Sequence, residues 1–155
     1  MALNLVGVVE NQMDDLVIFN RPIQEVFAFV ADHANDKLWK PFVTESRKIS
    51  AGEIGVGTQF EIVTVAWGYR RAGVVEILEY EPYRSYAYKA NDPIYPFIAR
   101  LAFSEIPSGT QIHGQVEFQA KGVWKLFTPL FLTFIRSQSK QTFNRLKQIM
   151  EQGKP

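Results

Sequence analysis

Cysteine is absent from the 155 residues, and histidine occurs only twice. Without cysteine the chain can form no disulfide, no thiolate metal site and no cysteine nucleophile. A transition metal needs three or four convergent ligands, and His33 and His113 lie far apart in the sequence. We therefore expect no metal site.

Neither sign of charge dominates, and long apolar runs are missing. The 17 Lys and Arg residues against 16 Asp and Glu residues argue against nucleic acid as a partner. No uninterrupted apolar run approaches the roughly 18–20 residues of a membrane span. Residues 1–10 lack a basic beginning and make a poor signal peptide. We expect a soluble cytoplasmic protein with no membrane span.

The familiar nucleotide and hydrolase motifs are absent as well. There is no nucleophile elbow, phosphate loop or dinucleotide fingerprint. Gly52, Gly55 and Gly57 precede a strand and not a helix, so they cannot present a helix N-terminus to phosphate. The sequence therefore indicates turn glycines, no cofactor and no confident catalytic residue.

What is present is a composition of 46% hydrophobic and 21% charged residues, which predicts a single domain over residues 1–155.

A strand is expected over residues 14–20. Ile23, Val26, Phe27 and Val30 then recur at helical spacing, which predicts a helix over residues 22–31. One more helical turn follows before Pro41 stops it.

The pattern then changes to a period of two. Turn residues divide strands that we place at residues 43–50, 58–66, 69–80, 84–90, 97–106 and 110–120. The short connections predict an antiparallel meander. Apolar and polar residues alternate most clearly in the last strand, so one face of the sheet is expected to be apolar.

A long helix from Thr128 to about Glu151 completes the chain, with Thr128 as the expected N-cap and Pro129 at the first helical position. Phe127, Leu130, Phe131 and Phe134 share one face, which we expect to point into the interior. The second half is expected to face a sheet edge or a neighbour. Together with the inward side of the strands, this face supplies twelve candidate ligand-binding residues: Phe60, Ile62, Val75, Tyr86, Tyr88, Leu101, Phe103, Val116, Phe118, Phe127, Phe131 and Phe134.

Candidate proton-transfer groups are few. His33 follows Asp32 and could be drawn as an acid–base pair, but adjacent residues rarely face one site, and a loop-capping role for Asp32 is favoured. His113 and Arg100 are expected to point outward. Glu76 and Glu79 are three apart in a strand and are expected on opposite faces, which argues against a shared site.

The element order and several segments resemble one family. The run from Asn20 to Asp32, followed by Trp39-Lys40-Pro41, is similar to the opening of the polyketide cyclase/dehydrase and lipid-transport superfamily. Gly55-Val56-Gly57-Thr58 and the segment from Glu76 to Pro82 resemble later landmarks. The resemblance implies an α+β helix-grip fold, also called START-like or Bet v 1-like: a seven-stranded curved antiparallel sheet around a long C-terminal helix, with two short helices after strand 1.

Members of that superfamily share a cavity rather than a catalytic motif. The first hypothesis is therefore binding or transport of a small hydrophobic ligand, such as a lipid, an isoprenoid or quinone, or a polycyclic aromatic. The second is a cyclase or dehydratase enzyme that uses the same cavity. The third is a chaperone or interaction protein, which predicts an exposed apolar patch near residues 93–97 and the helix start. A homodimer is left open, and the many Phe side chains predict a small pocket.

Overall fold

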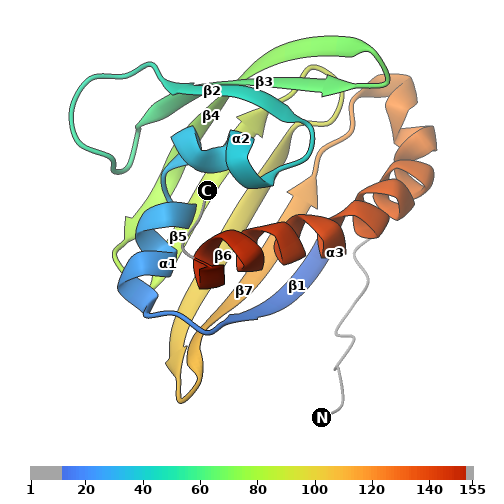
Figure 1. Ribbon diagram of the computed structural model, residues 1–155. Helices are drawn as coiled ribbons and strands as arrows, with labels where there is room; N and C mark the ends of the chain where they lie inside the picture. Colours follow the sequence, from blue (N-terminus) through green and yellow to red (C-terminus); the bar gives the residue numbers. More distant parts are fainter. Residues whose placement is uncertain (1–11, 153–155) are drawn as a thin grey trace.

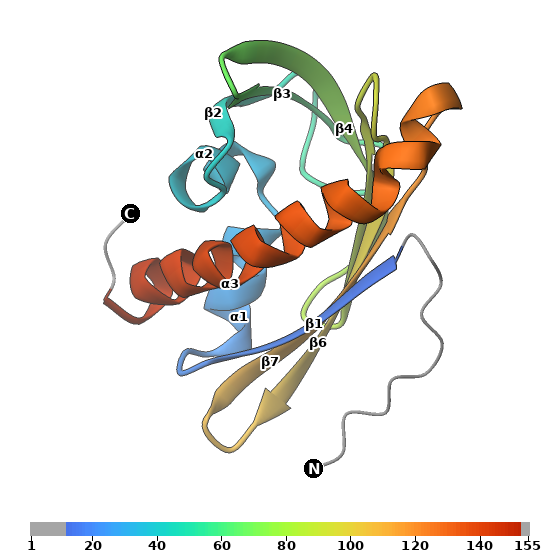
Figure 2. The same ribbon diagram turned by 90° about the vertical axis from the view of Figure 1, so that its right-hand side faces the viewer.

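The computed structural model describes residues 12–152, and the expectation for residues 1–10 lies outside this range. Its strands form one antiparallel sheet in the order β1-β7-β6-β5-β4-β3-β2. Figures 1 and 2 show how strongly this sheet curves. The strands are β1 (Gln12–Phe19), β2 (Val43–Lys48), β3 (Gln59–Ala66), β4 (Tyr69–Glu81), β5 (Ser85–Asn91), β6 (Phe97–Ile106) and β7 (Gly109–Phe118).

Helices cover the concave face of this sheet. The long helix α3 (Thr128–Gln152) runs across it, while α1 (Ile23–Val30) and α2 (Asp36–Trp39) lie beside the second half of α3 (Figure 2). Short 3-10 turns, η1 (His33–Asn35) and η2 (Gly122–Phe127), precede α2 and α3. The predicted α+β helix-grip fold is confirmed.

Alternation along the strands places the apolar side chains as expected. Phe60, Ile77 and Tyr86 are at most 1% exposed and belong to one cluster with Leu146 of α3. On β6, Ala99 and Phe103 are buried, while Arg100 between them is exposed. A shift of one residue would have reversed these faces, so the predicted register of the middle strands is correct.

A β-bulge in β4 changes one expectation. Ile77 lies opposite Tyr88 of β5, and Glu79 lies opposite the next residue, Ala87, so Leu78 has no paired residue in β5. Because a bulge adds one residue to a strand, Glu79 returns to the outward face that Glu76 also occupies. The prediction that these two carboxylates face opposite sides was therefore wrong.

The packing of α3 differs in part from the prediction. Leu146 and Met150, in the second half, are buried in the main core, whereas Leu130 is 72% exposed. In the first half, Leu132 is only 3% exposed and joins a smaller cluster with Phe118, against which Phe131 also packs. The inward face of this half is therefore rotated from the predicted one: it keeps Phe131, adds Leu132 and leaves Leu130 in solvent.

Thr128 also differs from the prediction. It has helical backbone angles and follows directly on the turn η2, so it is not an N-cap. Its hydroxyl donates to the Trp124 carbonyl at 3.4 Å instead of accepting from an amide. The helical path therefore begins within the residues before Thr128.

Candidate functional site

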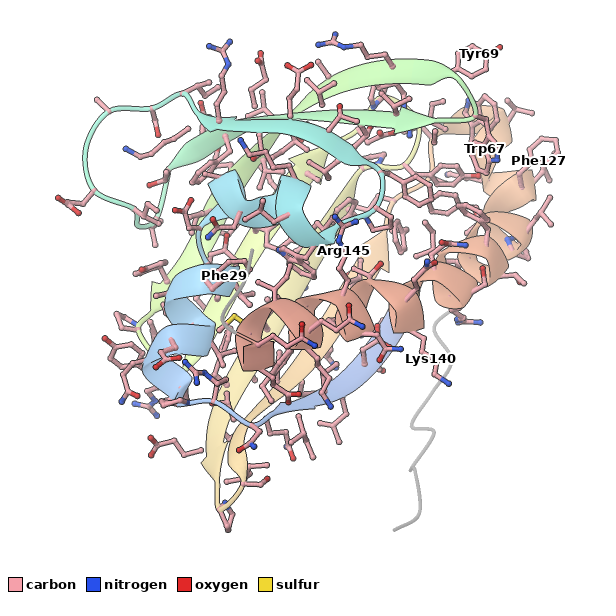
Figure 3. The ribbon with its side chains drawn as sticks, in the orientation of Figure 1. Phe29, Trp67, Tyr69, Phe127, Lys140 and Arg145 are labelled. Carbon is pink, nitrogen blue, oxygen red and sulfur yellow. The ribbon has the colours of Figure 1, made fainter. Side chains whose placement is uncertain are left out.

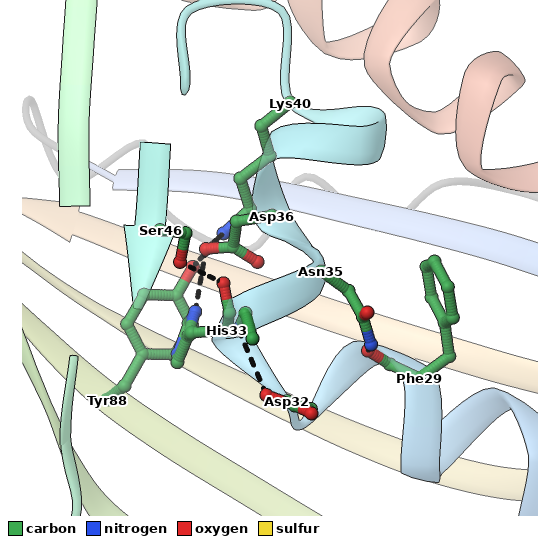
Figure 4. A network of polar contacts seen from close by, with 9 residues as sticks. Phe29, Asp32, His33, Asn35, Asp36, Lys40, Ser46 and Tyr88 are labelled. Atoms are coloured by element: carbon green, nitrogen blue, oxygen red, sulfur yellow. Dashed lines mark hydrogen bonds and ion pairs between the residues drawn. The ribbon is translucent and has the colours of Figure 1, made fainter. Parts of the chain in front are cut away.

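Three of the buried polar residues, His33, Asp36 and Ser46, lie in or against the connection between α1 and β2 (Figure 4). The Asp32 carboxylate accepts from the Ala34 amide at 2.9 Å and starts the turn η1. The Asn35 side chain donates to the Phe29 carbonyl at 3.0 Å, and Ser46 donates to the carbonyl of His33. These bonds tie the connection in place, and the predicted capping role of Asp32 is confirmed.

His33 pairs with Asp36 and not with Asp32. Its Nδ1 lies 2.7 Å from Asp36 Oδ2, and the side chains are 1% and 3% exposed. Lys40 Nζ lies 2.8 Å from the same carboxylate oxygen and 3.4 Å from the Tyr88 hydroxyl. The one-turn helix α2 thus places a carboxylate between an imidazole and an ammonium group, with a phenol from β5 beside them.

Electrostatics holds Asp36 and Lys40 as an ion pair. Burial alone would raise the pKa of the Asp36 carboxyl, but the Lys40 ammonium and the His33 ring outweigh burial and lower it. Burial alone would lower the pKa of Lys40, yet the Asp36 carboxylate, assisted by Tyr88, raises it. Both groups therefore stay charged across the neutral range.

Aromatic rings enclose this ion pair. The His33 ring packs edge-on against Tyr88, with centroids 4.4 Å apart, and against Phe60 at 5.4 Å. Lys40 Nζ lies 5.0 Å from the Trp39 ring centroid and 5.2 Å from that of Tyr88. Such cation–aromatic contacts add about 0.5–2 kcal/mol each, depending on how dry the site is.

Tyr86 lies deeper, behind Tyr88 on the same strand. Burial is the largest of the effects that raise the pKa of its hydroxyl. Neither that hydroxyl nor His33 Nε2 has a hydrogen-bond partner among residues 12–152. The ring centroids of Tyr86 and His33 are 5.7 Å apart.

A cavity of about 120 Å³ opens beside this cluster. Asp36, Lys40 and Tyr88 contribute its polar end. A second ion pair, between Arg71 Nη1 and Asp92 Oδ1 at 3.1 Å, also lines it. The remaining wall is largely apolar and includes Val43, Ile62, Gly73, Val75, Ala90 and Phe97.

Three of the twelve sequence-predicted ligand residues line this cavity, namely Ile62, Val75 and Tyr88. The others lie elsewhere. Phe60, Tyr86, Leu101, Phe103 and Val116 belong to the main core or pack against it, and Phe118 and Phe131 belong to the smaller cluster or pack against it. Phe134 packs on Trp67 and Phe42.

Phe127 does not point into the interior as expected, because it lies in η2 and is 50% exposed. Helical spacing had grouped it with the residues that follow. The turn η2, however, precedes α3 and rotates Phe127 away from the sheet, and this change of direction was not predicted.

Sequence reasoning missed the charged residues that line the cavity, namely Asp36, Lys40, Arg71 and Asp92. The spacing of Asp36 and Lys40 by four residues in a helical turn was a usable signal, since such residues share a helix face. The pair of Arg71 with Asp92 joins β4 to the end of β5 and had no comparable local signal.

Residues 12–152 contain no group of three or more His, Asp or Glu side chains arranged to hold a metal ion. Within the same range no helix is both long and apolar enough to cross a membrane.

A family model described as polyketide cyclase / dehydrase and lipid transport matches residues 12–151. The chain belongs to this family. Its predicted resemblance to the polyketide cyclase/dehydrase and lipid-transport superfamily is therefore confirmed. No protein with curated annotation matches the chain in sequence.

Several solved structures share the fold of this polyketide cyclase/dehydrase family member. TTHA0849 from Thermus thermophilus has a TM-score of 0.76 at 13% identity, with 93% of this chain and 99% of that chain covered. A START superfamily protein from Mycobacterium smegmatis gives 0.73 at 13% identity, covering 92% and 98%. The di-domain ARO/CYC BexL from the BE-7585A biosynthetic pathway gives 0.70 at 17% identity, covering 90% of this chain and 50% of that chain.

At these identities the likeness establishes the fold alone. Family and fold together suggest hydrophobic ligand binding or polyketide cyclase-type chemistry.

Proposed function

We propose that the protein binds one small, mostly apolar molecule in the cavity between α2 and strands β3 to β5, and that it does not transform this molecule. The apolar wall with polar groups gathered at its ends is the usual composition of such a site. The observation that carries the proposal is the ion pair of Asp36 and Lys40 at the cavity. This pair can form hydrogen bonds with a ligand, and both groups stay charged at neutral pH because the pKa of Asp36 is lowered and that of Lys40 is raised.

The size of the cavity restricts the ligand. A cavity of about 120 Å³ is close to the about 150 Å³ that accommodates benzene in another protein. A single substituted ring fits this space, whereas a sterol or a fused polycyclic molecule would extend beyond it through the open side of the cavity. Of the predicted ligand classes, the quinone is therefore favoured, because its single ring fits this space; other single-ring compounds join it as candidates.

The polar end of the cavity favours a ligand with an acceptor oxygen. Lys40 Nζ has three protons, of which Asp36 takes one at 2.8 Å and Tyr88 lies at a weaker 3.4 Å. A carbonyl or hydroxyl oxygen of a ligand can accept from the remaining one. Because Asp36 already balances the charge of Lys40, we expect the site to prefer a carbonyl or hydroxyl group over a strongly anionic one.

The same electrostatics disfavours proton transfer. A general acid or base works best when its pKa lies near the working pH. The pKa of the Asp36 carboxyl is lowered and the pKa of Lys40 is raised, so the first is a poor base and the second a poor acid at neutral pH. The pair suits holding a ligand better than exchanging protons with it.

The first test is calorimetric binding of benzoquinone, phenol, benzoate and toluene to the wild type and to Ala90→Phe. Ala90 lines the cavity, so phenylalanine there fills it and should lower affinity at least about tenfold. Ala102→Phe on the exposed face of β6 is the matched control and should bind like the wild type. Equal binding by the two variants, or no binding by the wild type, would contradict the proposal.

Tyr88→Phe tests the polar end separately. Removing the hydroxyl should weaken binding of the oxygen-bearing compounds about five- to tenfold, the effect of one lost hydrogen bond, while toluene binding stays unchanged. An equal loss for toluene would mean that the substitution disturbs the cavity and that Tyr88 does not select polar ligands.

An enzyme of the cyclase type is the second candidate, and the buried His33 and Tyr86 favour it. Each has a polar atom without a hydrogen-bond partner among the described residues, and a catalytic role is one explanation for such an atom. Neither residue lines the cavity itself. Mass spectrometry of a poly-ketone compound incubated with the wild type and with Tyr86→Phe distinguishes the two candidates, since only an enzyme would give a dehydrated product that the variant fails to make.

A further inference from the structure

Large apolar side chains are exposed together where η2 meets α3. Leu126 is 80% exposed, Leu130 72%, Val123 62%, Phe127 50% and Trp124 43%. Five such residues within eight positions are unusual, because monomeric soluble proteins rarely expose large contiguous apolar patches. We call these residues, with the hairpin tip described next, the η2 patch.

The hairpin between β3 and β4 extends this patch. Trp67 and Tyr69 are 74% and 76% exposed. The Trp67 ring centroid lies 4.8 Å from that of Phe134 in α3, which brings the hairpin tip to the start of the long helix. Figure 3 shows Trp67, Tyr69 and Phe127 at one corner of the molecule. Two segments about sixty residues apart in the chain therefore form one aromatic and aliphatic surface.

Two lysines lie beside this surface. They are the only charged residues between positions 119 and 135, although the whole chain is almost neutral. Lys121 and Lys125 lie in or next to η2 and are both exposed. Exposed apolar side chains beside lysines are the composition of protein surfaces that bind anionic lipid.

We propose that the η2 patch docks the protein on the surface of an anionic lipid bilayer. Trp67, Trp124 and Tyr69 are the residue types that favour the headgroup region, and Leu126 and Leu130 would reach the acyl boundary. The positive charge of the patch argues against a second copy of the chain, since two such faces would repel each other. The hydrophobic contact and the lysines together select a negatively charged lipid surface.

The patch is connected to one end of the cavity. The Tyr95 hydroxyl donates to the Trp124 carbonyl at 3.0 Å. The amide of Tyr95 donates to Asp92 at 2.8 Å, and Asp92 lines the cavity with Arg71. Docking would therefore hold the Arg71–Asp92 end of the cavity near the bilayer. The docking itself does not depend on which ligand, if any, the cavity binds.

The test is sedimentation of the full chain with vesicles of phosphatidylcholine alone and of phosphatidylcholine mixed with phosphatidylglycerol. The wild type should bind the mixed vesicles more tightly. Leu126→Ser with Leu130→Ser should lower that binding at least about tenfold, since each leucine loses its burial in the bilayer. Lys121→Gln with Lys125→Gln should lower it about fivefold for each charge, and only for the anionic vesicles.

Val56→Ser is the matched control. Val56 is 70% exposed, but it lies in the loop between β2 and β3, at the opposite end of the molecule from the start of α3 in Figure 1. The Val56→Ser variant should bind vesicles like the wild type, and circular dichroism should show that all variants are folded. Equal binding by the wild type and the double-leucine variant would overturn the proposal. So would a dimer in light scattering that the leucine substitutions dissociate, because a second copy would then cover the patch.

Discussion

At the scale of single residues, the ion pair of Asp36 and Lys40 is the interaction on which the site depends. Asp36 is 2% exposed and also holds His33 Nδ1 at 2.7 Å, so one carboxylate serves two partners. Removing it would leave a partly buried ammonium without its counter-charge. Replacing a buried ion pair by apolar residues of similar size often leaves the stability of a protein unchanged. A charged pair in the wall of a cavity is therefore better explained by ligand binding than by stability.

Asp36→Asn should lower the free energy of unfolding at pH 7 by about 3 kcal/mol, the lower end for breaking a buried pair, because Lys40 keeps some contact with water. The pKa of the Asp36 carboxyl is lower in the folded than in the unfolded protein. Its contribution is therefore present above the unfolded pKa and is lost as pH falls through the folded pKa. Urea unfolding at several pH values should show the difference between wild type and variant shrinking in acid.

Arg47→Gln provides the comparison for that experiment. Arg47 pairs with Glu61 on the surface, with 72% of its side chain exposed, and its loss should cost less than about 1 kcal/mol. If Asp36→Asn cost no more than this surface change, the buried pair would not stabilise the fold.

At the scale of elements, the turn between β6 and β7 fixes the sheet against the chain that enters α1. Gly109 has φ +140°, and a Cβ there would overlap the Phe19 carbonyl and lie 2.8 Å from the Arg21 amide nitrogen. The neighbouring Thr110 hydroxyl donates to the Arg21 carbonyl at 2.8 Å. This close approach of two backbones needs a residue without a side chain.

Gly109→Ala should therefore lower the unfolding free energy by more than about 3 kcal/mol, from backbone strain together with the overlap. Gly52→Ala is the control: Gly52 has φ +87°, but nothing lies within 4 Å of the added carbon, so only strain of about 1 kcal/mol is expected. Thermal unfolding of both variants measures the difference. Similar melting temperatures would show that the turn can move away from Phe19 at little cost.

Elements also show where sequence reasoning succeeded and where it ended. Strand faces follow from a period of two, so the burial of Phe60 and Tyr86 and the exposure of Arg100 were predictable. The bulge after Ile77 and the turn before Thr128 each change the direction of the chain locally. The spacing of hydrophobic residues does not predict such changes. For the same reason the cavity-lining pair of Arg71 and Asp92, which depends on strand pairing, was not predictable from spacing.

At the scale of the whole molecule, α3 joins two separate hydrophobic clusters. Its second half enters the main core through Leu146 and Met150, which belong to one cluster with residues of α1 and of the concave sheet. Its first half enters a smaller cluster through Leu132, together with Met13 and Phe118. The part of α3 next to the η2 patch thus rests on the smaller of the two clusters, and we expect it to open more readily than the rest of the fold.

Leu132→Ala and Leu146→Ala should therefore act differently, although both side chains are at most 3% exposed. Leu146→Ala should lower the global unfolding free energy by about 2–5 kcal/mol, because it leaves a hole in the main core. Leu132→Ala should instead speed hydrogen exchange mainly in residues 122–135, with a smaller change in the strands. Mass spectrometry of peptides after exchange measures both effects. Uniform acceleration in both variants would mean that the two clusters unfold as one unit, and the start of α3 would then be as rigid as the sheet that it covers.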